Sequence, residues 1–242
     1  MNTRMIKSKS TLAINHIVSD ILKEKTPAGE FLKGENELAL SLGVSRTSVR
    51  SALQTLASKG LITITPKVGS VANTPDKWNW LDHDVLRWVT EYKASDTFIP
   101  HLLEVRLMVE PNAAALAAVN ATGDNLASLE RSYNLMAQGL ERNDRAQINI
   151  GDIEFHKQLL IATKNPFLIS LGDALTTTME VSFSRTLEQD VILSKPALDD
   201  HYEVMDAVRM RKPEEARDKM REIIMGAIAK TVKKLKGTEL IR

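Results

Sequence analysis

The sequence contains no cysteine and no long apolar run, and each absence excludes a class of protein. Without cysteine among its 242 residues, the chain has no disulfide, no thiolate ligand for a metal and no cysteine nucleophile. No stretch approaches the roughly 18 consecutive apolar residues that a transmembrane helix needs. The first ten residues are polar and basic with no apolar segment behind them, so we expect no signal peptide. These features predict a cytoplasmic protein that does not enter a membrane.

An excess of charge of one sign is also absent. The chain has 32 basic and 31 acidic residues, a net charge of +1, which taken alone argues against a nucleic-acid partner. The distribution is uneven, because residues 1–76 hold ten basic and six acidic residues, a charge of +4. The remaining 166 residues therefore hold 22 basic and 25 acidic residues, a charge of −3. This division is consistent with separate partners for the two parts.

The residue pattern changes at the same point. Residues 11–60 have helical periodicity, and residues 60–65 and 70–72 alternate like the strands of a hairpin around Pro66 and Gly69. The segment Asn73-Thr74-Pro75-Asp76 is typical of a linker. We therefore predict two domains, residues 1–75 and residues 76–242.

The N-terminal part has the order of elements of a winged helix-turn-helix. A first helix carries one apolar face, formed by Ala13, Ile14, Ile17, Val18, Ile21 and Leu22. A short helix follows over residues 35–42, Gly43 supplies a tight turn, and Ser45 is a good N-cap for a third helix that runs to about Lys59. The predicted hairpin then forms the wing.

Polar residues gather at the start of the third helix, namely Ser45, Arg46, Thr47, Ser48 and Arg50. A recognition helix enters the major groove N-terminus first, so these side chains are candidates for contacts with bases and phosphates. In the wing, Lys67 and Gly69 are candidates for the DNA backbone or minor groove. The alternative is an ordinary solvated helix start in which Arg50 only forms a salt bridge.

The C-terminal part consists of helical periods, which predict an all-helical bundle of six or seven helices. Polar residues interrupt its apolar stripes at Arg106, Asp152, His156 and His201. Because an unpaired charge inside a bundle is costly, such residues should satisfy one another, bind a ligand or hold a metal. For Arg106, a simple helix-stabilising pair with Glu110 is the alternative, and for each histidine a satisfied core position.

The segment Gly43-Val44-Ser45-Arg46-Thr47-Ser48-Val49-Arg50 is followed by Leu56, Gly60-Leu61 and Gly69. Over residues 28–75 this pattern resembles the DNA-binding domain of the GntR family of bacterial repressors. The resemblance implies an operator in double-stranded DNA as the partner and adds Glu35 to the DNA-binding residues. Asn36 stands where the family commonly has an arginine that contacts DNA, and Ser51 stands where it commonly has glutamate. We therefore expect an operator preference that differs from the usual one.

A second set of motifs comprises Glu104-Val105-Arg106 with Glu110, Asp152-x-x-Phe155-His156, Asn165-Pro166 and His201 ahead of Asp206-Ala207. Over residues 80–235 these resemble the FCD domain, the effector-binding domain of one GntR branch. There, an aspartate and three histidines often hold a divalent metal that helps to bind a carboxylate. The resemblance implies Asp152, His156 and His201 as ligands of one divalent metal such as zinc. Ile223 occupies the position of the last histidine, so a metal-free cavity is the alternative.

The segment Trp78-Asn79-Trp80-Leu81-Asp82, with Asp84-Val85-Leu86 and Trp88-Val89, resembles sugar-acid-responsive members of the family. It implies a small carboxylate effector, a sugar acid such as galactonate. We expect Arg106 to pair with the effector carboxylate in a bidentate fork, and Asp152, His156, Arg185 and His201 to line the same cavity.

These observations favour a homodimeric transcription regulator, a repressor that is not an enzyme and that changes its operator binding when it senses the effector. The alternative is a metal-dependent enzyme that uses Asp152, His156 and His201, with the N-terminal module as an accessory binding domain. No inward glutamate or serine near this trio is placed as a general base or nucleophile, which argues against it. A ligand-free architectural DNA-binding protein is a third possibility, and it conflicts with the inward polar residues.

Overall fold

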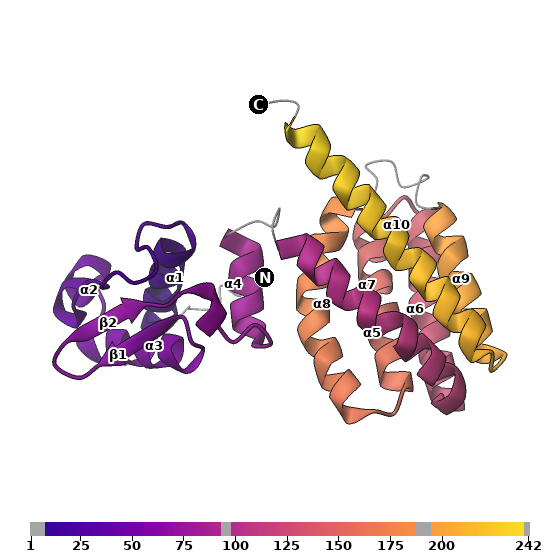
Figure 1. Cartoon of the computed structure of the whole chain (residues 1–242), viewed down its shortest axis with the longest axis horizontal. Coiled ribbons are helices and arrows are strands. Elements are labelled where there is room, and N and C mark those ends of the chain that lie inside the picture. Colours follow the sequence, from indigo (N-terminus) through magenta and orange to yellow (C-terminus); the bar gives the residue numbers. More distant parts are fainter. Residues whose placement is uncertain (1–7, 93–97, 187–194, 240–242) are drawn as a thin grey trace. The chain divides into compact units, whose positions relative to one another are not determined.

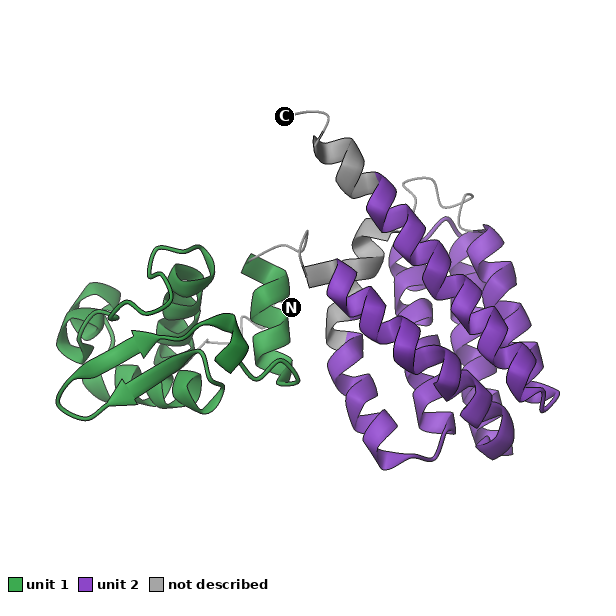
Figure 2. Cartoon of the chain, in the orientation of Figure 1, with its two compact units in different colours: residues 1–94 green, residues 95–242 purple. Residues whose placement is uncertain are grey.

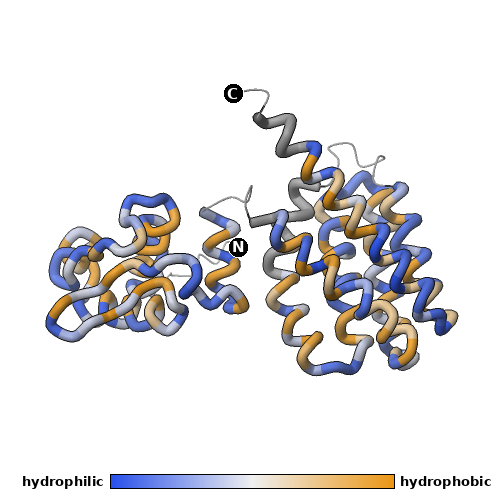
Figure 3. Tube along the Cα trace, in the orientation of Figure 1, coloured by the Kyte–Doolittle hydropathy of each residue, from blue (hydrophilic) through white to orange (hydrophobic). Residues whose placement is uncertain are grey.

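The structure, a computed structural model, describes residues 8–92, 98–186 and 195–239. The chain divides into two compact units, residues 1–94 and residues 95–242 (Figure 2). Hydrophilic and hydrophobic residues alternate along the helices of both units, as expected for helices with one buried face (Figure 3). None of the described helices is long and apolar enough to cross a membrane.

The first unit has the predicted winged helix-turn-helix order (Figure 1). Its elements are α1 (Lys9–Leu22), α2 (Glu35–Leu42), α3 (Arg46–Ser58), β1 (Ile62–Thr65), β2 (Gly69–Ala72), the 3-10 helix η1 (Pro75–Lys77) and α4 (His83–Tyr92). The apolar faces of α1 and α3 pack together, with Ile17 and Val18 buried from α1 and Val49 and Leu56 from α3. The predicted core face of α1 is therefore confirmed, although Ile14 is only half-buried.

Two residues set the geometry of the helix-turn-helix. Gly43 ends α2 with a left-handed φ of 63°, a conformation that glycine adopts without strain. Ser45 then caps α3, because its side chain accepts a hydrogen bond from the Ser48 amide. β1 and β2 pair antiparallel in the register Ile62 with Ala72, and Phe31 forms a further isolated bridge to Val71.

The segment after the hairpin lies directly against the end of α3. A Cβ on Gly60 would lie 2.1 Å from the carbonyl oxygen of Lys77, so only glycine allows the backbone to pass this closely. The amide of Asn79 donates to the carbonyl of Lys59 at 3.0 Å. Trp78 is 7% exposed, and its Nε1 donates to the carbonyl of Asn73 at 3.3 Å.

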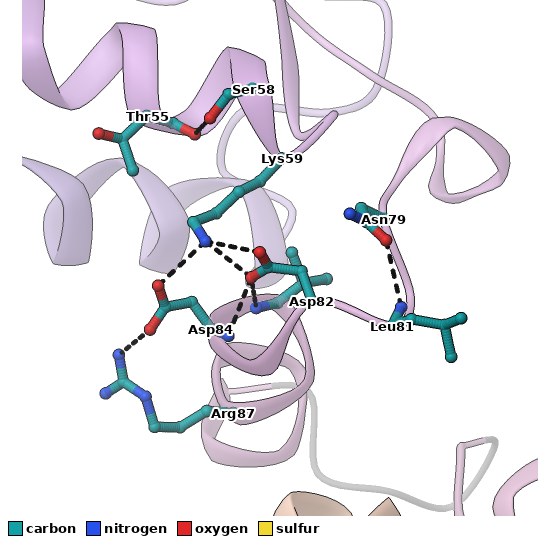
Figure 4. Close-up of polar contacts among 9 residues, drawn as sticks. Thr55, Ser58, Lys59, Asn79, Leu81, Asp82, Asp84 and Arg87 are labelled. Atoms are coloured by element: carbon teal, nitrogen blue, oxygen red, sulfur yellow. Dashed lines mark hydrogen bonds and ion pairs between the residues drawn. The ribbon is translucent and has the colours of Figure 1, made fainter. Parts of the chain in front are cut away.

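Lys59, the C-cap of α3, forms ion pairs with two aspartates at the start of α4 (Figure 4). Its ammonium group lies 2.7 Å from Asp82 Oδ2 and 3.1 Å from Asp84 Oδ2, at the start of α4. Asp84 also accepts from Arg87 at 3.0 Å, and the Lys59 ammonium lies 6.0 Å from the centre of the Trp88 ring. Because of these contacts, η1 and α4 belong to the first compact unit, which extends to residue 94 instead of ending at the linker segment near residue 75.

The second unit is all-helical in its described residues and contains six helices, which confirms the predicted bundle. They are α5 (Phe98–Asn120), α6 (Gly123–Glu141), α7 (Arg145–Ala162), α8 (Pro166–Thr186), α9 (Lys195–Arg209) and α10 (Pro213–Glu239). Their main core combines small and large residues, including Ala114, Phe155, Leu159, Val204 and Met220. Helices α5, α7 and α9 all contribute to this core, and the polar residues described below lie on the same three helices.

Candidate DNA-binding surface and metal centre

The polar residues predicted for DNA contact lie together at the start of α3. Arg46, Thr47 and Arg50 are exposed, whereas Val49 and Ala52 point into the core of the first unit. Ser45 and Ser48 are joined by a 2.8 Å contact between their hydroxyl oxygens, which fixes the first turn. The helix therefore presents hydroxyls and guanidinium groups outward at its N-terminal end, the end that reads a major groove in this class of domain.

The wing presents the two residues that the sequence indicates. Lys67 and Gly69 are both exposed; Lys67 lies in the turn between β1 and β2, and Gly69 is the first residue of β2. Both have positive φ, 63° for Lys67 and 138° for Gly69. A Cβ on Gly69 would lie 3.3 Å from the Phe31 ring, so glycine also fits the space beneath the turn.

Glu35 and Arg50 form a bidentate ion pair between α2 and α3. Arg50 donates from Nε to Glu35 Oε1 at 3.1 Å and from Nη2 to Oε2 at 2.8 Å. The hydrogen bond from Arg50 lowers the pKa of Glu35 from its ordinary value, with further contributions from the charges of Arg50 and Arg46. The salt bridge considered for Arg50 is therefore present, and its partner is another residue of the predicted DNA-binding set.

In the second unit, three helices bring a polar cluster into the bundle. Arg106 and Glu110 come from α5, Asp152 and His156 from α7, and His201 from α9. The side chains of Arg106, Glu110 and His156 are at most 1% exposed, that of His201 is 5% exposed and that of Asp152 is 13% exposed. The inward positions that helical spacing predicts are therefore confirmed for four polar residues, namely Arg106, Asp152, His156 and His201.

Three donor atoms of this cluster converge. Asp152 Oδ1 lies 3.0 Å from His201 Nε2 and 3.3 Å from His156 Nε2, and the two Nε2 atoms are 3.4 Å apart. Zinc binds nitrogen and oxygen at about 2.0–2.2 Å, so neighbouring ligands of a tetrahedral ion are about 3.3 Å apart. The three separations therefore have the size of one face of such a tetrahedron, and the donor set suits a borderline cation such as zinc.

The other nitrogen of each imidazole is held by an acceptor outside this triangle. His201 Nδ1 is 2.6 Å from the carbonyl oxygen of Ala197, and His156 Nδ1 is 2.7 Å from Glu110 Oε2. When Nδ1–H donates to these acceptors, the lone pair of each Nε2 points toward Asp152. Metal-ligating histidines are usually oriented in this way, so the second contacts fit a metal centre as well as the first.

Arg106 is engaged with Glu110 in this structure. Its Nε donates to Glu110 Oε1 at 2.6 Å and its Nη2 to Oε2 at 3.3 Å, and Nη2 also lies 3.3 Å from His156 Nε2. The fork that the sequence led us to expect for an effector carboxylate is thus directed at a carboxylate of the same helix. The side chain of Arg185, in α8, lies outside the described residues.

The charges of the cluster favour ionised carboxylates. Burial alone would raise the pKa of Glu110, but the charges of Arg106 and His156 lower it to about 2. Burial opposes ionisation of Asp152 as well, yet the imidazoles of His201 and His156, when they carry a proton on Nε2, hold its pKa far below the ordinary value through their charge and hydrogen bonds. Both carboxylates are therefore negative at neutral pH, as a cation site requires.

Sequence reasoning missed the role of Glu110 and of the segment at Lys59. Glu110 was considered only as a helix pair for Arg106, because its contact with His156 spans 46 positions and leaves no local signal. Ile223, at the position of the family's last histidine, packs against the main core and supplies no metal ligand. The donor triangle therefore holds three protein ligands among the described residues.

Comparison with known proteins identifies both units. Residues 10–71 match the family "Bacterial regulatory proteins, gntR family", and residues 101–225 match the FCD domain. The galactonate operon transcriptional repressor of Escherichia coli K12 is 32% identical over 205 residues, covering 85% of this chain and 89% of the relative. The repressor NanR of Klebsiella aerogenes is 26% identical, covering 84% of this chain and 79% of the relative.

Solved structures show the same fold. Lar of Listeria monocytogenes aligns over 95% of this chain and 99% of its own with a TM-score of 0.67 and 18% identity. McbR/YncC of Escherichia coli aligns over 94% and 98% with a TM-score of 0.54 and 20% identity.

The fold and the matches define a DNA-binding transcription regulator with a ligand-sensing domain. The chain belongs to the GntR family, in the branch that carries an FCD domain. Members of this family are regulators, so the chain is not an enzyme, and the alternative of a metal-dependent enzyme is set aside. The matched FCD domain likewise sets aside a ligand-free architectural protein.

Proposed function

We propose that the chain is a transcriptional repressor that binds its operator as a homodimer and responds to a sugar acid. Ser45, Arg46, Thr47, Ser48 and Arg50 bind one half-site, Lys67 and Gly69 contact the backbone or minor groove, and Glu35 lies beside them. The first compact unit carries the DNA-binding function, and the second carries effector binding and dimerisation. The protein acts in the cytoplasm, since its partner is the operator.

The observation that carries the sensing half of the proposal is the donor triangle. Its separations of 3.0, 3.3 and 3.4 Å and the outward hydrogen bonds of both histidines fit a divalent cation. Asp152, His156 and His201 hold the ion, and Glu110 and Ala197 orient the two imidazoles. When bound, the ion supplies a positive centre with open positions for carboxylate and hydroxyl oxygens of the effector.

The effector class follows from this positive centre and from the relatives. The galactonate repressor is the relative at 32% identity, and a sugar acid has one carboxylate and several hydroxyls to offer such an ion. Arg106 is hydrogen-bonded to Glu110 and lies beside His156. We therefore propose that Arg106 attracts the effector carboxylate by its positive charge and does not form a bidentate contact with it. Arg185 is proposed to line the same cavity.

A ligand changes operator binding only if it favours one arrangement of the two subunits over another. We propose that effector binding changes the spacing of the two recognition helices across the palindromic operator. The residues that bind the effector, and so determine its affinity for each arrangement, lie in the second unit. The residues that contact the major groove lie in the first unit. Variants of the two units therefore have separable effects.

A thermal-shift screen tests this proposal. The full chain is heated with each member of a panel of aldonates and uronates, with and without a chelator, because a ligand of the folded state raises the apparent stability. We expect at least one sugar acid, galactonate first, to raise the midpoint and the chelator to abolish that rise. Arg50→Ala is expected to keep this shift and to bind the operator more weakly than wild type. A screen in which no sugar acid acts would contradict the effector class.

A further inference from the structure

The recognition helix presents its second arginine already bound to a carboxylate of the same unit. Arg50 lies one turn after Arg46 on α3, and Glu35 is the first residue of α2. Their two hydrogen bonds measure 3.1 and 2.8 Å, although the side chain of Arg50 is 60% exposed. Glu35 is better shielded, at 30% exposure. In this structure the exposed guanidinium is thus oriented by a carboxylate of its own unit.

In the Glu35–Arg50 ion pair, one edge of the guanidinium contacts Glu35, and another edge remains available for a base of the DNA. A guanidinium has five N–H donors on a rigid plane. Glu35 engages one side of that plane, formed by Nε and Nη2. The adjacent end, formed by Nη1 and the second hydrogen of Nη2, has the spacing for a bidentate contact with O6 and N7 of guanine. The two contacts use different hydrogens, so they are compatible.

We propose that Glu35 is a positioning residue that sets the base preference of Arg50 in the operator half-site. This inference rests on the proposed DNA-binding role of Arg50, and it assigns Glu35 a contact with arginine in place of a contact with DNA. A free arginine side chain samples many rotamers and reaches several bases or phosphates. If Glu35 fixes the orientation of Arg50 before DNA binds, the Arg50 side chain loses less conformational entropy when it contacts a base. This favours the one base contact that the fixed orientation allows.

The chain offers a matched control on the same helix. Glu37 lies two residues after Glu35 in α2, is 61% exposed and pairs with Lys33 at 3.5 Å. Glu35→Ala and Glu37→Ala remove the same charge from the same short helix. Both therefore change the electrostatic attraction to DNA similarly. Only Glu35→Ala removes the contact with Arg50.

The experiment selects binding sites from a random-sequence DNA pool with the full-length chain and its variants, followed by competition binding. Arg50→Ala identifies the half-site position that depends on Arg50. We expect Glu35→Ala to weaken discrimination at that same position by about tenfold. Glu37→Ala should leave the discrimination at that position at the wild-type value. Glu35→Gln, which retains one acceptor, should restore part of it. Equal thermal midpoints of the variants show that the fold is kept.

The double variant decides between positioning and direct reading. If Glu35 acts through Arg50, the base profile of Glu35→Ala/Arg50→Ala equals that of Arg50→Ala. An additive change at another position would mean that Glu35 contacts a base itself and would overturn the inference. Equal profiles for Glu35→Ala and Glu37→Ala would also overturn it. A wild-type chain that selects no sequence would refute the DNA-binding role together with the inference.

Discussion

The ammonium group of Lys59 at the end of α3 lies 2.7 Å from Asp82 Oδ2, just before α4. With the 3.1 Å contact to Asp84, this pair attaches the start of α4 to the end of the recognition helix. The Lys59 side chain is 16% exposed, so water screens these contacts only partly. Helix α4 is therefore held within the DNA-binding unit by an identifiable ionic contact.

Replacing Lys59 should loosen this attachment. Lys59→Met keeps an apolar stem of similar length, but it removes the charge between Asp82 and Asp84. We expect the free energy of unfolding of the first unit to fall by roughly 1–3 kcal/mol. Thermal denaturation followed by circular dichroism measures this change, with Lys77→Met, at an exposed position, as the control. An unchanged midpoint for Lys59→Met would show that the contact contributes nothing.

The stability difference between wild type and Lys59→Met should depend on pH. Burial alone would raise the pKa of Asp84, but hydrogen bonds from Lys59 and Arg87 lower it below 3.8, its ordinary value. A lowered pKa stabilises the fold above the ordinary value, and this contribution is lost as the pH falls through the lowered value. We expect the difference to be constant from pH 7 to pH 5 and to shrink below about pH 4. A difference that grows on acidification would contradict the assignment.

Zinc should stabilise the chain through the donor triangle. At a free zinc concentration about 100 times the Kd, the expected gain is roughly 3 kcal/mol, or about 5–10 °C in midpoint. His201→Ala and Asp152→Ala should lose this gain, because each removes one corner of the triangle. His101→Ala, whose side chain is 77% exposed on α5, should keep it. Equal zinc shifts in His201→Ala and wild type would place the ion elsewhere.

Glu110 should tune metal affinity without touching the ion. Its Oε2 lies 2.7 Å from His156 Nδ1, so Glu110→Gln weakens the contact that orients the imidazole. We expect zinc affinity to fall about 10–100-fold, measured by competition with a chromophoric chelator. Glu104→Gln removes a charge from an exposed position of the same helix and serves as the control. Wild-type affinity in Glu110→Gln would leave Glu110 with a purely structural role.

Features encoded by local spacing could be predicted from the sequence. Gly43 and the Ser45 cap mark the turn, and the four-residue steps around Asp152 and His156 place both on an inward face. These signals are local because helix caps and periodicity depend on neighbouring residues.

Contacts between distant segments could not be predicted in this way. Lys59 pairs with Asp82 across 23 positions, and Glu110 contacts His156 across 46. Proline and polar residues after the hairpin suggested a linker, yet this segment packs on Gly60 because glycine leaves room for the Lys77 carbonyl. Tertiary packing, which local composition does not report, determined where the first unit ends.

The central claim is that a ligand bound at Asp152, His156 and His201 controls how the first unit holds DNA. Fluorescence anisotropy of a selected operator, titrated with the zinc-loaded chain with and without each sugar acid, measures this directly. We predict that at least one sugar acid weakens operator binding by wild type and that Asp152→Ala and His201→Ala bind the operator but do not respond. The account would be contradicted if no sugar acid changes operator binding by wild type. It would also be contradicted if a sugar acid weakens operator binding by the two variants as much as by wild type.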